Sequence, residues 1–338
     1  MPVPAPARNA SLDALRVLSL LGIISLHVAG GGFHDQKPLG FVVDELSRFA
    51  VPVFFILSAY FWKPEELAAP LRLIRRVAWR VLVPFIAWTA ITVAWRYLEQ
   101  PQKPLDLSLP TLANLAWTGG PAFHLWFLPA LVVATALVAT SGKFLGWTVT
   151  LVIAAFLFVL GTTFGAYSRM LSGQSFPFWL DRNGVFFGPI FLVAGVLLRR
   201  HGDLLARVPI LAIVATLAVF AALQLAEGYF IVGRYPMGHD YSLATLGYAL
   251  AVTALFMRLH LAGPWWSTLG RATFSAYLVH LLVLKLLVDT LHIGDNSPLA
   301  IGMTFAASLA LGLAWQWARA AMWPRIKPRA AVDPSGSS

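Results

Sequence analysis

Residues 11–27 read SLDALRVLSLLGIISLH, an apolar run that carries three ionisable side chains, Asp13, Arg16 and His27. The run continues to residue 31, and about 20 apolar residues in a helix are enough to cross a bilayer. Nine similar runs follow. The ten predicted spans cover residues 12–31, 46–62, 81–98, 123–140, 145–165, 183–198, 208–226, 241–260, 273–290 and 298–318. We therefore expect an all-α, polytopic membrane protein with about ten transmembrane helices.

The composition supports this prediction. Of 338 residues, 58% are hydrophobic and only 12% are charged, whereas about one quarter of a soluble domain is charged. The mean hydropathy is +0.72. No polar stretch is long enough for a second domain, so we predict one membrane domain over residues 11–322. The Ala/Pro-rich residues 1–10 and the basic residues 323–338 are expected to be disordered tails.

Several kinds of chemistry are excluded by what the sequence lacks. There is no cysteine, which excludes disulfides, thiolate zinc sites and a cysteine thioester. There is also no Gly-x-Ser-x-Gly elbow, His-Glu-x-x-His helix, Walker loop or His-x4-Asp motif. We expect no metal site. The pI of 10.2 does not indicate nucleic-acid binding, because the basic residues form no separate tail or face.

The distribution of basic residues predicts the topology. With a cytoplasmic N-terminus, 17 of the 25 basic residues fall on the cytoplasmic side and 8 do not, as the positive-inside rule requires. We therefore expect both termini in the cytoplasm and the protein in the inner (cytoplasmic) membrane. The 17 residues are Arg8, Arg16, Lys63, Arg72, Arg75, Arg76, Arg80, Lys143, Arg199, Arg200, Arg207, Arg258, Arg271, Arg319, Arg325, Lys327 and Arg329.

The charged side chains of the first span are candidate functional groups, since ionisable residues within a membrane are costly. Arg16 and His27 are eleven residues apart, which places them on one helix face and roughly 16 Å apart along the axis. Asp13 lies three residues before Arg16 and can pair with it. A neutral imidazole is also the usual general base near neutral pH. The alternative is that Asp13 and Arg16 mark the cytoplasmic helix end and His27 the opposite interface.

Four stretches in this order resemble the membrane-bound acyltransferase 3 family. They are Arg16-x10-His27 preceded by Leu12-Asp13, then VPVFFILSAYFW at 51–62, HLWFLPAL at 124–131 and SAYLVHLLVL at 275–284. Members of this family transfer acetyl or other short acyl groups to cell-envelope sugars. The compact chain is similar to the subgroup that acylates surface polysaccharides or their lipid-linked precursors.

The resemblance implies roles for the first-span residues. His27 would take the proton from an acceptor hydroxyl or help to form an acylated intermediate. Arg16, with its neighbour Asp13, would bind the acyl donor or orient the site. The donor implied is acyl-CoA, most simply acetyl-CoA, and no permanently bound cofactor is expected.

A cluster of arginines precedes the third span, in LRLIRRVAWRVLVPF at 71–85. Guanidinium groups suit phosphate oxygens, so the cluster could bind the phosphates of acyl-CoA. The family has an Arg-x-x-Arg element before its third helix; the alternative is the positive-inside rule acting on a cytoplasmic loop. The predicted donor-binding residues are Arg72, Arg75, Arg76 and Arg80.

Three later residues are candidate acceptor-binding groups. His124 and Trp126 begin the fourth span, where an aromatic ring and an imidazole suit a sugar, although aromatic residues there also form lipid-interface belts. His280 and Lys285 are ionisable residues within the ninth span; they either line the cavity or bond backbone carbonyls. The loop GRYPMGHDYS at 233–242 could touch the acceptor, but its composition is typical of a solvated turn.

A transporter or flippase is the main alternative function, with Arg16, His27 and His280 forming a path for protons or a polar solute. It would move its solute without acyl-CoA. The absence of an internal repeat weakly disfavours transporters built from inverted halves. The sequence does not determine the acyl group, the acceptor sugar or the oligomeric state.

Overall fold

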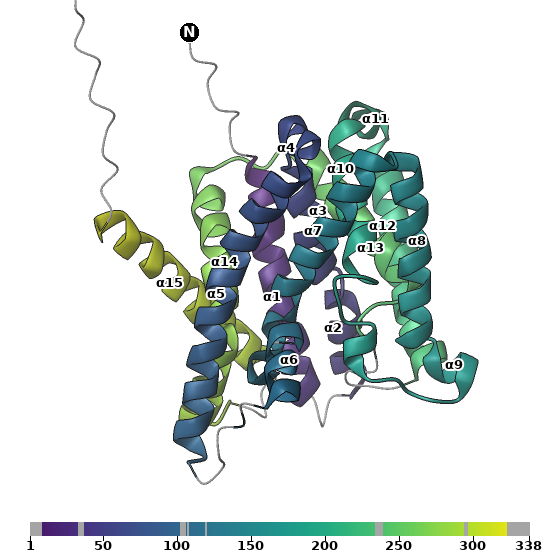
Figure 1. Cartoon of the computed structure of the whole chain (residues 1–338). Coiled ribbons are helices and arrows are strands. Elements are labelled where there is room, and N and C mark those ends of the chain that lie inside the picture. The colour runs from purple at the N-terminus through teal and green to yellow at the C-terminus, as the bar shows by residue number, and fades with distance from the viewer. Residues whose placement is uncertain are drawn as a thin grey trace, which may run out of the picture.

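The computed structural model describes residues 9–32, 37–101, 106, 108–118, 120–233, 239–293 and 297–322. Within these ranges every regular element is a helix, and the long helices run side by side as one bundle (Figure 1). The prediction of an all-α fold is confirmed. Residues 1–8 and 323–338, which make up most of the two predicted tails, lie outside the described residues.

The helices follow one another with short connections. They are α1 (Ala10–Gly32), α2 (Lys37–Ser47), α3 (Ala50–Tyr60), α4 (Pro64–Ala68), α5 (Pro70–Glu99), α6 (Leu109–Thr118), η1 (Gly120–Trp126), α7 (Phe127–Phe144), α8 (Trp147–Phe164), α9 (Ser168–Ser172), η2 (Phe178–Leu180), α10 (Gly188–Arg200), α11 (Gly202–Arg207), α12 (Ile210–Ala226), η3 (Glu227–Val232), α13 (Leu243–Arg258), α14 (Pro264–Leu291) and α15 (Ser297–Met322).

Seven helical segments in the described residues are long and apolar enough to cross a membrane. They are Ala10–Val28, Pro70–Glu99, Ala122–Phe144, Trp147–Phe164, Ile210–Val232, Pro264–Leu291 and Ser297–Met322. Each coincides with one of the ten predicted spans, so the multi-pass character is confirmed. The total of ten spans and the placement of both termini in the cytoplasm stay predictions.

The other three predicted spans correspond to shorter helices: α3 has 11 residues, α10 has 13 and α13 has 16. At 1.5 Å per residue, α3 is only about 16 Å long, whereas the hydrocarbon core is about 30 Å thick. Non-helical backbone at membrane depth is tolerated where protein buries it or where it lines a wet cavity. A polar cavity is therefore expected where these helices begin.

The centre of the bundle is tightly packed. α1 contacts α14, α2, α15, α3 and α13, and α10 packs along α3. Two glycines of α10 allow this approach: a Cβ on Gly195 would lie 2.2 Å from the Ile56 carbonyl oxygen, and one on Gly188 would lie 2.7 Å from the Phe55 ring. Small residues at such crossings are a common feature of membrane bundles.

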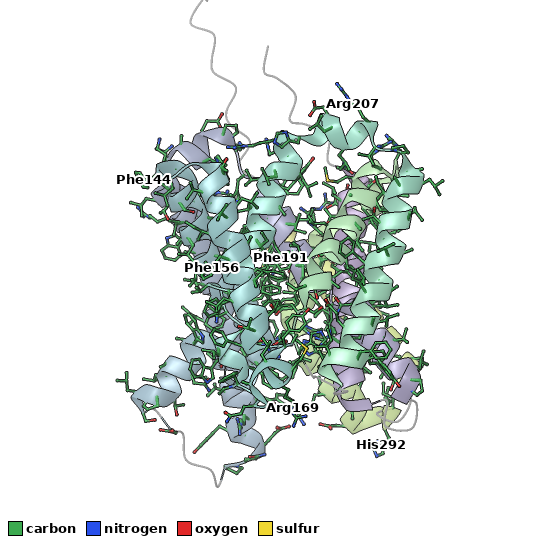
Figure 2. All side chains as sticks on the ribbon, turned by 90° about the vertical axis from the view of Figure 1, so that its right-hand side faces the viewer. Phe144, Phe156, Arg169, Phe191, Arg207 and His292 are labelled. Atoms are coloured by element: carbon green, nitrogen blue, oxygen red, sulfur yellow. The ribbon has the colours of Figure 1, made fainter. Side chains whose placement is uncertain are left out.

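The periphery presents apolar side chains outward. Phe144 and Phe156 are 75% and 65% exposed and project from the surface, whereas Phe191 is completely buried inside the bundle (Figure 2). Trp79 on α5 and Trp317 on α15 are also exposed. Exposed apolar side chains of this size suit contact with lipid tails rather than with water.

Candidate active site

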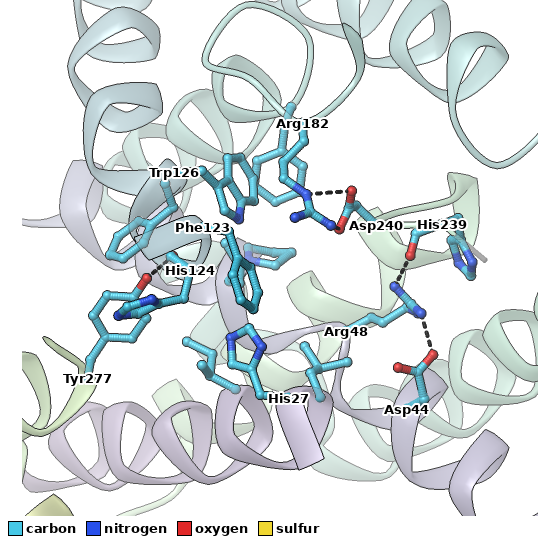
Figure 3. Close-up of a pocket in the computed structure, with 16 residues that line it drawn as sticks. His27, Asp44, Arg48, Phe123, His124, Trp126, Arg182, His239, Asp240 and Tyr277 are labelled. Carbon is cyan, nitrogen blue, oxygen red and sulfur yellow. Dashed lines mark hydrogen bonds and ion pairs between the residues drawn. The ribbon is translucent and has the colours of Figure 1, made fainter. Parts of the chain in front are cut away.

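A polar cavity of about 80 Å³ lies where the three short helices begin. Its lining includes Arg48 from the α2–α3 break, Arg182 from the loop before α10, and Asp240 from the segment before α13. α1, η1 and α14 complete the wall (Figure 3). We call it the histidine pocket. Since a liquid water occupies about 30 Å³, the pocket holds a few waters or one small polar group.

Three histidines meet at one side of the pocket. His27 comes from α1, His124 from η1 and His280 from α14. The ring centroid of His280 lies 5.1 Å from that of His27 and 5.1 Å from that of His124. The centroids of His27 and His124 are 6.4 Å apart. His27 is partly exposed, whereas His124 and His280 are buried. The partly exposed imidazole therefore faces the pocket, and His280 lies deeper.

Tyr277 holds η1 against α14 at this point. Its hydroxyl donates a hydrogen bond to the backbone carbonyl of His124 (Figure 3). The His124 Nε2 lies 3.5 Å from the carbonyl oxygen of Leu278, also on α14. These contacts join residues more than 150 positions apart and fix the position of the His124 ring.

An arginine–aspartate ion pair lies across the pocket from His27 (Figure 3). Arg182 donates two hydrogen bonds to Asp240, from Nε to Oδ2 at 2.8 Å and from Nη2 to Oδ1 at 2.7 Å. The guanidinium carbon is 5.0 Å from the ring centroid of Phe178 and 5.8 Å from that of Trp126. The bidentate bond and the aromatic faces hold the arginine in one orientation.

A second buried ion pair forms another wall. Arg48 donates to the Asp44 carboxylate and to the backbone carbonyl of His239 (Figure 3). Its Nε lies 3.3 Å from Glu45, which also accepts a 2.7 Å hydrogen bond from Gln224 and lies 3.5 Å from the His239 Nε2. The charges that line the pocket are therefore two guanidinium groups and two carboxylates, each paired within the protein.

Four predicted site residues come together in this region. His27, His124 and Trp126 line the histidine pocket, and His280 packs behind His27. Their proposed roles in catalysis and acceptor binding stay predictions. Among the described residues, no group of three or more His, Cys, Asp or Glu side chains is arranged to hold a metal ion.

Arg16 and Asp13 do not line the histidine pocket. The Arg16 Nη1 lies 2.5 Å from Asp13 Oδ1, and its guanidinium carbon is 5.0 Å from the Phe61 ring at the end of α3. Asp13 is completely buried against α14, where a Cβ on Gly270 would lie 2.6 Å from that of Asp13. This pair therefore belongs to the half of α1 that is distant from His27.

The predicted arginine cluster lies in the first turns of α5. All four side chains are exposed, and in the described part of the chain only Arg76 has an ion pair, at 2.7 Å with Glu66 of α4. We call these residues the arginine rim: Arg72, Arg75, Arg76 and Arg80. The rim and the histidine pocket are separate sites in the structure.

Two interpretations of the sequence are wrong. The loop at 233–242 is not merely a solvated turn, because His239 is 3% exposed and Asp240 lines the pocket; Arg234 lies outside the described residues. Neither alternative given for Lys285 holds, because this residue is not in the pocket lining and its Nζ pairs with the carboxylates of Glu99 and Asp289, both at 3.0 Å, near the bundle surface rather than with backbone carbonyls.

Sequence reasoning missed Asp44, Arg48, Arg182 and Tyr277 as pocket residues. A signal was present for two of them, since the letters DELSR at 44–48 place charges at the start of a predicted span. Arg182 directly precedes another predicted span and gave a similar signal. Tyr277 lies within the stretch SAYLVHLLVL at 275–284, but nothing in the sequence indicated that its hydroxyl reaches η1.

Comparisons with known proteins identify relatives of this chain. It is 25% identical over 294 residues to a serine/alanine racemase of Enterococcus gallinarum, an alignment that covers 81% of the chain and 40% of that protein. It is 26% identical over 203 residues to an amino-acid racemase of Enterococcus faecalis, covering 55% of the chain and 27% of that protein. The chain thus spans two fifths or less of these relatives. No solved structure matches it significantly.

A family model for an acyltransferase domain, that of the acyltransferase 3 family, matches residues 9–316. The match begins just before α1, ends within α15, and includes every helix that contributes to the histidine pocket. The family resemblance noted in the sequence is therefore confirmed, although the subgroup is not resolved. This multi-pass membrane protein belongs to the acyltransferase 3 family.

Proposed function

We propose that this protein is an O-acyltransferase that moves an acetyl or other short acyl group from cytoplasmic acyl-CoA to a hydroxyl of a cell-envelope polysaccharide or lipid-linked glycan precursor. One observation carries this proposal: His27, on the first helix of an acyltransferase 3 chain, faces a small polar pocket beside His124, and His280 packs behind it. A base positioned at a cavity of this kind suits the activation of a hydroxyl.

The reaction balances with the groups named. His27 takes the proton from the acceptor hydroxyl, and the oxygen forms a bond to the acyl carbonyl carbon. The thioester C–S bond breaks, and the CoA thiolate leaves and is reprotonated. The hydroxyl oxygen and the carbonyl carbon must come within about 3–3.5 Å, so the acceptor enters the pocket beside His27.

The pocket suits one hydroxyl group of an uncharged sugar. Arg182 and Asp240 already satisfy each other, so an ionic acceptor would leave one of them without a counter-charge. A neutral hydroxyl can instead donate to the Asp240 carboxylate and accept from Arg182. Trp126 and Phe123 offer aromatic faces for the apolar face of a sugar ring.

The donor is assigned to the opposite half of the molecule. The exposed guanidinium groups of the arginine rim suit the phosphates of CoA, and Arg16 lies on the same face of α1 as His27, roughly 16 Å along the helix axis. The donor arm would run along this face from the rim to the pocket. The positive-inside rule then favours a cytoplasmic rim in the inner membrane and a pocket that opens to the outer side.

The racemase names of the relatives do not enter this proposal. The chain aligns with 40% of one relative and 27% of the other, so the racemase activity for which those proteins are named can reside outside the shared part. Transport of a polar or lipid-linked solute stays the alternative, and the experiment below distinguishes it.

The test is mass spectrometry of envelope glycans and their lipid-linked precursors from cells with the wild-type protein, without it, and with His27→Ala. We expect a mass increment of one acyl group only with the wild type. The matched control is His201→Ala, because His201 is an exposed histidine at the end of α10 and should leave the increment intact.

Two outcomes would contradict the proposal. Identical glycans in all samples, with the protein well expressed, would overturn acylation in that host and direct attention to solute transport. A full increment with His27→Ala would remove His27 as the base. In each case, membrane insertion of the variants is checked by extraction and size-exclusion chromatography.

A further inference from the structure

His280 occupies a place in the cluster that differs from that of the other two histidines. It is completely buried and does not belong to the lining of the pocket. Its ring is tilted by 33° to that of His27, with 5.1 Å between the centroids. His280 therefore contacts the proposed base from behind, on the side away from the acceptor.

The hydrogen bond on the other side of His280 determines which ring nitrogen carries its proton. Nδ1 lies 2.5 Å from the backbone carbonyl oxygen of Tyr277. A carbonyl oxygen only accepts hydrogen bonds, so the proton is on Nδ1, and in the neutral ring Nε2 has a free lone pair.

The Nε2 atom of His280 is buried and has no hydrogen-bond partner among the described residues. A doubly protonated ring would leave a buried N–H without an acceptor, which is costly, so the neutral form is favoured. A buried acceptor of this kind needs a donor. His27 and His124 both line the pocket, and the ring centroid of each lies 5.1 Å from that of His280. The Nε2 atom of His124 faces the Leu278 carbonyl oxygen, which only accepts, so the His124 proton is on Nε2 and His27 is left as the donor.

The distance allows that bond. With the centroids 5.1 Å apart, facing ring nitrogens can approach the roughly 2.9–3.0 Å of a hydrogen bond once the rings turn toward each other. Catalytic hydrogen bonds are often long without substrate and tighten in the complex.

His124 is the competing acceptor and is less well placed. Its Nδ1 is also buried without a partner in the described part of the chain, but its centroid is 6.4 Å from that of His27 and the rings are nearly perpendicular, at 87°. His124 also lines the pocket and can contact the acceptor directly. The geometry therefore distinguishes His124, which can contact the acceptor, from His280, which cannot.

We infer that His280 is a positioning residue whose bare Nε2 accepts a hydrogen bond from His27, which directs the unprotonated nitrogen of His27 toward the acceptor hydroxyl. This inference rests on the proposed acyl transfer. When His27 takes the hydroxyl proton, both of its nitrogens carry protons, and the N–H that faces His280 keeps its acceptor. The proton later leaves with the CoA thiol, and His280 exchanges no proton.

Two substitutions test the roles of the two His280 ring nitrogens separately. Asparagine at this position, His280→Asn, keeps a donor near the Tyr277 carbonyl but has no acceptor where Nε2 was. Glutamine, His280→Gln, reaches the Nε2 position with an amide oxygen that accepts. The matched control is Thr273→Val, because Thr273 is buried on the same helix and its hydroxyl bonds only the carbonyl of Gly270 in the contacts described.

The assay uses the full chain in proteoliposomes, labelled acetyl-CoA, and the envelope glycan fraction from cells that lack the protein. We expect His280→Asn to lower kcat by about 10- to 100-fold, part of the roughly 10²–10⁴-fold that a positioned base supplies. The KM for the glycan fraction should be unchanged, because His280 does not touch the acceptor. His280→Gln should recover several-fold of the kcat that His280→Asn loses, and Thr273→Val should match the wild type.

Several results would overturn the inference. A positioning role is contradicted if a folded His280→Asn protein keeps the wild-type kcat. It is also contradicted if the Asn and Gln variants lose equal activity, or if only KM changes. Each of these results would leave acyl transfer itself established. No label incorporation by the wild type would overturn the proposed function and this inference together.

A measurement on the wild-type protein does not depend on the folding of variants. In ¹⁵N-histidine NMR of the full chain, we expect His280 as the neutral tautomer with its proton on Nδ1. The opposite tautomer, with the proton on Nε2, would contradict the inference directly.

Discussion

The histidine pocket and the arginine rim hold their charges in opposite ways. In the pocket, the Arg182 and Asp240 side chains are 16% and 17% exposed and pair through two hydrogen bonds, and Arg48 and Asp44 are buried more deeply. At the rim, the four arginines are exposed, and Arg76 is the one with an ion pair among the described residues.

This difference indicates what each site can bind. The pocket charges are neutralised and oriented by the protein, so they can recognise hydroxyl groups by direction without adding net charge. The rim charges are solvated and movable, so they suit phosphates that need neutralisation but little fixed geometry. Single substitutions should therefore have large effects in the pocket and small effects at the rim.

The largest effect is expected at the proposed base. In purified protein, His27→Gln should lower kcat by about 10²–10⁴-fold, the usual contribution of a positioned general base, with little change in the KM for acetyl-CoA. Steady-state kinetics measure both constants. A kcat near that of the wild type would show that the pocket is not where the hydroxyl is activated.

The ion pair across the pocket should come next. Arg182→Met and Asp240→Asn each remove one partner, and the loss of charged hydrogen bonds costs about 1.5–3 kcal/mol when both groups are buried. Because both side chains are partly exposed, we expect about 1–2 kcal/mol, or roughly tenfold in kcat/KM for the glycan fraction. The double variant should be no worse than either single one. Additive losses would mean that the two residues act separately.

The arginine rim should respond only to combined substitution. Exposed ion pairs are worth about 0.2–1 kcal/mol each, so one Arg→Gln change should raise the KM for acetyl-CoA by less than about fivefold. The change of all four should raise it by roughly tenfold or more and reduce its salt dependence. Arg207→Gln is the control, because Arg207 is exposed on α11, which lies at the same end of the bundle as α4 and the start of α5 (Figure 1). An unchanged KM in the quadruple variant would overturn donor binding at the rim.

A pH measurement tests the buried carboxyl of Asp181, which precedes the pocket residue Arg182 in the chain. Burial and then the Asp240 charge raise the pKa of the Asp181 carboxyl to about 8, against the weaker opposing effect of Arg182. In an unfolded chain this pKa is about 3.9. Between about pH 4 and pH 8 the unfolded chain has released the proton that the folded protein keeps, so the free energy of unfolding falls across this window and levels off above it.

The substitution Asp181→Asn should remove that contribution. We expect the difference in Tm between pH 5 and pH 8, measured in detergent, to be smaller in the variant than in the wild type, and the variant to be the more stable protein at pH 8. Parallel curves for the two proteins would show that Asp181 is ionised in the folded state.

The smallest effect is expected at Lys285. Its ion pairs with Glu99 and Asp289 are exposed, and such pairs contribute about 0–1 kcal/mol. Lys285→Gln should therefore leave Tm and kcat/KM within error of the wild type. A marked loss of transfer, measured with the same glycan fraction, would show that Lys285 takes part in the reaction.

Local features of the chain predicted much of the architecture. Helix type and the seven long spans follow from the length of the apolar runs, because a bilayer requires each span to satisfy its own backbone hydrogen bonds. The same reasoning overestimated α3, α10 and α13, since hydropathy does not detect that a helix begins a few residues after its apolar run begins. Those late starts are what create the histidine pocket.

The site was predicted in part. His27, His124, Trp126 and His280 were identified through family motifs, and the structure brings them together. Arg182 and Asp240 could not be paired from the sequence, because 58 positions separate them. The position of the arginine rim relative to the pocket could not be predicted either, because it depends on how α5 and α1 are placed in the bundle.

The sequence by itself determined that this chain is helical, crosses a membrane several times and belongs to the acyltransferase 3 family, because hydropathy and ordered motifs are properties of neighbouring residues. Only the tertiary structure decided that His280 lies behind His27 and that the charges of the pocket are paired within the protein. Those facts depend on which helices pack against α1, and packing is decided by contacts between segments that are distant in the chain.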